Sequence, residues 1–74
     1  MVKLTQTGNR LQELRTAAGI SRAGLADYVG VGETQVRRWE VGDVLIPTRH
    51  LERLTAKLDV TVEYLLGWDR EEAA

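Results

Sequence analysis

The chain has 74 residues and a formal net charge of −1, with 11 acidic against 10 basic side chains and no cysteine. A disulfide framework and a thiolate zinc site are therefore excluded, and a chain this short has room for one hydrophobic core. Nothing resembles a signal peptide or an apolar span of about twenty residues, so we expect a soluble, cytoplasmic protein with no membrane partner.

The first predicted helix covers residues 6–18 and is followed by Gly19, a residue type that commonly ends helices. Leu11, Leu14 and Ala18 recur at intervals of three and four residues, which is the spacing of one helix face. These three side chains are therefore expected to face the core. Leu4 is expected to pack beneath this helix.

A second, shorter helix is predicted to begin after Ser21, whose hydroxyl can accept a hydrogen bond from a backbone N–H two or three residues further on. Leu25, Ala26 and Val29 form its apolar face, and Gly30 ends it in the left-handed conformation. A helix this short is not stable alone in water, so it must pack against other elements.

The third helix is predicted from about Glu33 to the residue before Gly42, directly after a short glycine-flanked turn. Val36 and Trp39 are apolar and three residues apart, so we assign them to the buried side together with Glu40. Trp39 is accordingly expected to be a core residue and not an aromatic platform for stacking nucleic-acid bases.

At about 100° per residue, the opposite side of the third helix carries Thr34 and Arg38, with Gln35 and Arg37 on its flanks. Arginine can donate two hydrogen bonds to guanine O6 and N7, and glutamine can pair with adenine N6 and N7. Glu33 has two interpretations, because it can accept from cytosine N4 or complement the helix dipole. This face predicts contact with double-stranded DNA; the alternative is a set of ordinary solvated charges.

A fourth helix is predicted to open at Pro47-Thr48, after an irregular connection over residues 43–46. Its apolar residues repeat at three and four positions: Leu51, Leu54 and Leu58. The single histidine, His50, lies in the first turn with no second ligand nearby, so we expect a surface residue with no metal role.

Thr61 is predicted to cap a short fifth helix over residues 62–66. No segment alternates with period two over a useful length. We therefore expect an all-α fold in which five helices surround one leucine-rich core.

The two helices over residues 20–42 resemble the helix-turn-helix of the phage lambda repressor and Cro class, which is widespread among small bacterial regulators. The resemblance runs through most of the chain, in register, at Leu11, Leu14, Arg15, Gly19, Leu25-Ala26, Gly30-Val31, Val36, Trp39-Glu40, Gly42, Ile46-Pro47-Thr48, Leu54 and Leu65-Leu66-Gly67. It implies a lambda repressor-like DNA-binding domain over residues 1–67, followed by a short acidic tail over residues 68–74.

The resemblance also implies roles for particular side chains. Arg22, at the start of the second helix, is expected to grip phosphate, and Arg15 is expected to form a partly buried ion pair with Glu40. The residues expected to read DNA are Glu33, Thr34, Gln35, Arg37 and Arg38.

This chain departs from the family pattern at three places, one of which is Gly24, which replaces a better helix former in the second helix. Many relatives carry basic residues after the third helix, where this chain has Val41, Asp43, Val44 and Leu45. Gly32 also replaces the usual serine or threonine at the start of the third helix, which predicts a weaker cap.

Charge is divided unevenly along the chain. Residues 1–42 carry six basic and four acidic side chains, a balance of +2, whereas residues 43–74 carry four and seven, a balance of −3. The positive charge therefore lies in the half that contains the helix-turn-helix, which suits contact with phosphates.

The fifth helix and the residues after it are more apolar than a one-turn helix needs to close a small core. We assign Tyr64, Leu65 and Trp68 to contact with a second copy. Such a dimer would place the third helices of the two copies about 34 Å apart on a palindromic operator. In the alternative interpretation, Leu65 and Leu66 close the core and Trp68 lies over its edge.

The inventory of side chains argues against an enzyme, because the chain has one serine that serves as a cap, one histidine and no phosphate loop. We expect no cofactor, no metal and no small-molecule substrate. The predicted function is a sequence-specific, dimeric transcriptional repressor. The alternative is an antitoxin-like interaction module on the same scaffold that neutralises a partner protein.

Overall fold

The computed structural model describes residues 4–67, and within this range every regular element is an α-helix. The helices are α1 (Leu4–Ala17), α2 (Arg22–Val29), α3 (Glu33–Val41), α4 (Thr48–Leu58) and α5 (Val62–Leu66). The predicted all-α fold is confirmed. α1 begins two residues before and ends one residue before the predicted range of 6–18, and the other four helices occur where the sequence placed them. The expected packing of the Leu4 side chain, the position of Trp68 and the acidic tail over residues 68–74 lie outside the described residues.

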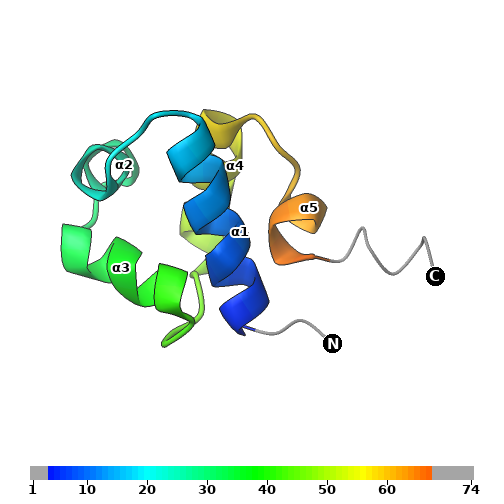
Figure 1. The fold of residues 1–74 in the computed structure, drawn as a ribbon. Coiled ribbons are helices and arrows are strands. Elements are labelled where there is room, and N and C mark those ends of the chain that lie inside the picture. Colours follow the sequence, from blue (N-terminus) through cyan, green and yellow to red (C-terminus); the bar gives the residue numbers. More distant parts are fainter. Residues whose placement is uncertain (1–3, 68–74) are drawn as a thin grey trace.

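The helices are arranged around α1. In Figure 1, α2 and α3 lie on one side of α1, and α5 lies on the other, with α4 behind. α3 packs against both α1 and α2, whereas α5 packs against α1 and α4. The helix-turn-helix and the last helix therefore occupy opposite sides of the molecule.

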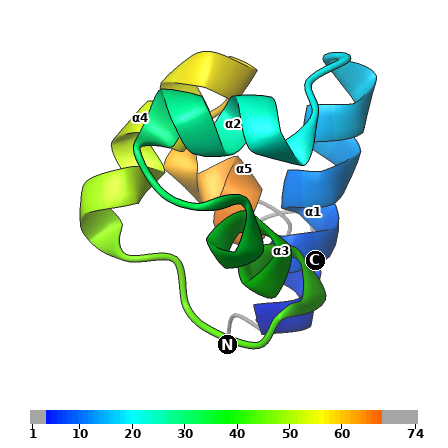
Figure 2. The ribbon, with the colours of Figure 1, turned by 90° about the vertical axis from the view of Figure 1, so that its left-hand side faces the viewer.

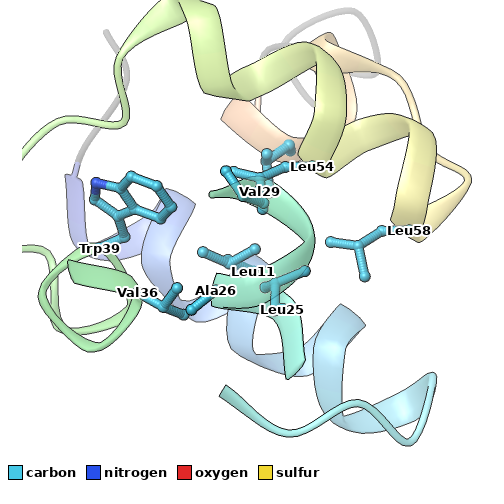
Figure 3. Close-up of a cluster of buried hydrophobic side chains, with 9 residues drawn as sticks. Leu11, Leu25, Ala26, Val29, Val36, Trp39, Leu54 and Leu58 are labelled. Atoms are coloured by element: carbon cyan, nitrogen blue, oxygen red, sulfur yellow. The ribbon is translucent and has the colours of Figure 1, made fainter. Parts of the chain in front are cut away.

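One core joins the four longer helices with α5. Figure 3 shows side chains from α1, α2, α3 and α4 converging on the space between them. Trp39 is 1% exposed, which confirms its assignment to the core. The buried apolar residues are Leu11, Leu25, Ala26, Val29, Val36, Trp39, Leu54, Leu58 and Leu65, and Leu14, Ile20 and Leu51 pack against them with partial exposure.

The inward orientation predicted for Ala18 is wrong. α1 ends at Ala17, and Ala18 is an exposed part of the turn that follows. Because Gly19 adopts a φ of 73° and reverses the chain there, Ile20 packs against the core instead.

A glycine that the sequence analysis did not single out sets the distance between α1 and α3. A Cβ atom on Gly8 would lie 2.3 Å from the Glu40 carbonyl oxygen and 2.5 Å from that of Trp39. The backbone of α1 therefore lies directly against the last turn of α3. Since both neighbours are backbone atoms, no side-chain movement can relieve such a contact.

The predicted caps of the short helices are confirmed. The Ser21 hydroxyl accepts a hydrogen bond from the Gly24 N–H at 3.0 Å, and the Thr61 hydroxyl accepts one from the Tyr64 N–H at 3.0 Å. Gly30 ends α2 with a φ of 90°, in the left-handed region. In the part of the chain that the structure describes, no helix has the length and apolarity needed to cross a bilayer.

The start of α3 has no side-chain cap, in line with the weaker cap predicted for Gly32. Gly32 occupies the N-cap position with φ −83° and ψ 157° and provides no side-chain acceptor. This backbone conformation is open to any residue, and no heavy atom lies within 4 Å of where a Cβ would be.

We therefore expect Gly32→Ser to raise the free energy of unfolding by a few tenths of a kcal/mol, measured by urea denaturation. A serine hydroxyl would accept a hydrogen bond from one of the free N–H groups in the first turn of α3. Gly32→Ala is the matched control, since it adds the Cβ without an acceptor. Equal stability of the two variants would contradict this account of the cap.

Candidate nucleic-acid interface

α3 has one buried side and one open side. Val36, Trp39 and Glu40 are buried, as the helical spacing predicted. The open side of α3 carries the exposed residues Glu33, Thr34, Arg37 and Arg38, and Gln35 lies half-buried at its edge. In Figure 2 the helix-turn-helix faces the viewer, with α3 below α2 and in front of α5.

A buried carboxylate holds α3 in place. The Glu40 side chain is 1% exposed, and its Oε2 accepts a hydrogen bond from Arg15 Nε at 2.6 Å. Arg15 also donates from Nη1 to the Ile20 carbonyl at 2.8 Å. The ion pair that the family resemblance implies is thus present, and Arg15 connects α1 to α3 and to the turn before α2.

Arg22 has a partner that sequence reasoning missed. Its Nε donates to Glu40 Oε1 at 2.8 Å, and 35% of the side chain remains exposed. Glu40 therefore bridges all three of the first helices. No local pattern could reveal this contact, because it joins residues 18 positions apart.

Arg38 also has a partner that was not foreseen. Its Nε donates to Asp43 Oδ2 at 3.0 Å, across the glycine that ends α3. Both side chains are about half exposed, so the pair lies at the surface. The sequence pattern marks Asp43 only as a departure from the basic residues of many relatives.

His50 lies at the surface with its side chain partly covered. Its ring centroid lies 5.6 Å from that of Trp39, with the ring planes tilted by 46°. The first turn of α4 therefore covers part of the tryptophan of α3, and the imidazole serves in packing.

The assignment of Leu65 to contact with a second copy is also corrected. Its side chain is fully buried in the core, because α5 turns it toward α1 and α4. Tyr64 is 39% exposed, and the Arg10 guanidinium lies 4.2 Å from the centre of its ring. A shallow, mostly apolar hollow of about 340 Å³ adjoins it, lined by Leu14, Val60, Thr61 and Tyr64.

α2 and α3 are two short helices joined by a tight turn, which is the arrangement of a helix-turn-helix. Residues 11–65 match the family model described as helix-turn-helix. The chain therefore belongs to the helix-turn-helix family of the lambda repressor and Cro type, a class of DNA-binding regulators.

Known proteins agree with this assignment. The chain is 30% identical over 59 residues to YonR of Bacillus subtilis (strain 168), an SPbeta prophage-derived uncharacterized HTH-type transcriptional regulator. This match covers 80% of the chain but 55% of YonR, so the chain spans about half the length of that relative.

Two solved structures resemble the fold over most of both chains. The restriction-modification controller protein C.AhdI from Aeromonas hydrophila superposes with a TM-score of 0.77 at 34% identity, covering 84% of this chain and 94% of its own. The P22 c2 repressor, in complex with a synthetic operator, superposes with a TM-score of 0.78 at 28% identity, covering 81% and 91%.

Proposed function

We propose that the protein regulates transcription by binding a specific sequence of double-stranded DNA, with α3 in the major groove. In its simplest form it is a dimeric repressor that occupies a palindromic operator. The observation that carries this proposal is the position of Arg37 and Arg38. Both lie on the open side of α3, turned away from the core.

The residues proposed to contact bases are Glu33, Thr34, Gln35, Arg37 and Arg38. Their side chains supply donors and acceptors that match base edges in the major groove. Arg22 begins α2 and is proposed to contact a phosphate with the part of its side chain that Glu40 leaves exposed.

Dimerisation is proposed through the surface around Tyr64. This residue is exposed beside an apolar hollow, and α5 lies on the opposite side of α1 from α3 (Figure 1). A second copy bound there would leave the open side of α3 accessible. Two-fold symmetry of the protein would then require a palindromic operator.

We expect Arg37→Ala and Arg38→Ala each to weaken binding to the preferred duplex by about tenfold or more, because each removes a group able to discriminate a base. The duplex is selected from a random pool with the unaltered protein, and affinity is measured by fluorescence anisotropy. Lys57→Ala removes one positive charge from the far end of α4 and is expected to change affinity by less than about threefold.

Circular dichroism and sedimentation of the same variants test the fold and the self-association separately. Loss of duplex binding with both retained would support the proposal. Undiminished binding by both arginine variants, or a pool that yields no consensus, would contradict it. A palindromic consensus together with a two-copy species would support the dimer.

The antitoxin-like interaction module is the second candidate. The apolar hollow beside Tyr64 and the −3 balance of residues 43–74 favour a protein partner. A partner protein that binds this surface when no duplex binds α3 would establish this alternative.

A further inference from the structure

We propose that Asp43 is a positioning residue that presents Arg38 to a guanine in the operator. The proposal rests on the proposed function and deepens it, because it names the base that Arg38 contacts and the residue that orients Arg38. The observation behind it is the hydrogen bond from Arg38 Nε to Asp43 Oδ2.

Asp43 occupies a fixed position at the end of α3. Its backbone N–H donates to the Arg38 carbonyl at 3.0 Å, in the hydrogen-bonded turn that closes the helix. Gly42 makes this turn with a φ of 81°, and a Cβ on it would lie 2.9 Å from the Thr5 backbone nitrogen. The start of α1 therefore packs against the turn that carries Asp43.

The carboxylate of Asp43 in turn restrains the guanidinium. The hydrogen bond comes from Arg38 Nε, on one edge of the planar group. Within residues 4–67, no hydrogen bond engages the edge formed by Nη1 and Nη2. Half of the Arg38 side chain is exposed, on the outward side of α3.

The free edge offers two parallel N–H donors, which match guanine O6 and N7. A free arginine side chain must lose rotational freedom to make both hydrogen bonds at once. Asp43 reduces this loss, because the guanidinium plane is already restrained before DNA arrives. Asp43 thus acts on base recognition through Arg38, without touching the base.

Two other roles for Asp43 predict different results. An exposed ion pair that only supports the end of α3 contributes little to stability, and its loss would leave base preference unchanged. An acid that merely competes with DNA for Arg38 would weaken binding to every sequence, so its removal would tighten binding without altering preference. Only the positioning role predicts that removal of the Asp43 carboxylate lowers base preference at a single position of the duplex.

The experiment measures relative affinity for all four bases at each position of the duplex selected by the unaltered protein. Arg38→Ala is expected to remove the preference for guanine at one position, which identifies the base that Arg38 reads. Asp43→Asn is expected to reduce that preference about three- to tenfold, and Asp43→Ala by more, while preferences elsewhere persist. Asp59→Asn is the matched control, since it removes the same charge at the end of α4, where asparagine tolerates the φ of 59°.

Unchanged guanine preference in Asp43→Ala would overturn the inference, as would uniformly tighter binding in both Asp43 variants. A consensus in which Arg38→Ala alters no base preference would overturn it while leaving the proposed function intact. A pool without any consensus would overturn both. Thermal unfolding of each variant, followed by circular dichroism, ensures that the proteins compared are folded.

Discussion

Glu40→Gln is expected to lower the free energy of unfolding by about 3 kcal/mol, because it leaves two arginines beside a buried site with no anion. The Glu40 side chain is 1% exposed, and Arg15 opposite it is 12% exposed. The expected loss lies at the lower end of the range for broken buried pairs, since Arg22 retains access to water. Urea denaturation followed by circular dichroism measures the change.

Glu52→Gln, on the exposed side of α4, is the matched control and is expected to change stability by less than about 0.5 kcal/mol. Substitution of the two arginine partners of Glu40 should lower the free energy of unfolding by different amounts. Arg15→Ala should cost more than Arg22→Ala, because Arg15 is more buried and also donates to the Ile20 carbonyl. A Glu40→Gln protein as stable as the control would show that the carboxylate does not hold the three helices together.

Gly8→Ala is expected to destabilise the protein by at least about 3 kcal/mol, although alanine normally favours a helix. The added Cβ would lie 2.3 Å from the Glu40 carbonyl oxygen, so α1 and α3 would have to separate. Separation would loosen the packing around Trp39 and the ion pair of Glu40 together. Chemical denaturation gives the change in stability.

Gly24→Ala is the matched control, because Gly24 also lies inside a helix, on the exposed side of α2. A Cβ there would meet only side-chain atoms, with Ser21 Oγ nearest at 3.2 Å. We expect a change of no more than about 1 kcal/mol in either direction. Similar effects of the two substitutions would mean that the close approach at Gly8 does not limit the packing of α1 on α3.

Both predictions concern how α3 is held and not what it contacts. The open side of α3 can be presented to DNA only if its buried side is anchored, and the anchors come from α1 and α2. Substitutions at Glu40 or Gly8 are therefore expected to affect DNA binding through loss of the folded state. Substitutions at Arg37 or Arg38 are expected to act on binding directly, because these side chains are exposed on the open side of α3.

The local sequence was sufficient to locate the helices, their caps and the two sides of α3. Caps depend on hydrogen bonds across three residues, as at Ser21 and Thr61, and helix faces depend on a fixed angle per residue. The family resemblance added the pairing of Arg15 with Glu40, which spacing within one helix cannot indicate. These features do not require knowledge of how the helices pack.

The remaining features required the packed molecule. The approach of Gly8 to α3, the second partner of Glu40 and the contact of His50 with Trp39 join residues that are distant in the sequence. Arg38 and Asp43 are close in sequence, but the direction of the guanidinium depends on the turn that Gly42 makes against α1. Local sequence specifies the backbone conformation and the buried face of each helix, because the interactions that decide them lie within a few residues. Contacts between helices form only once tertiary packing sets the distances between the helices.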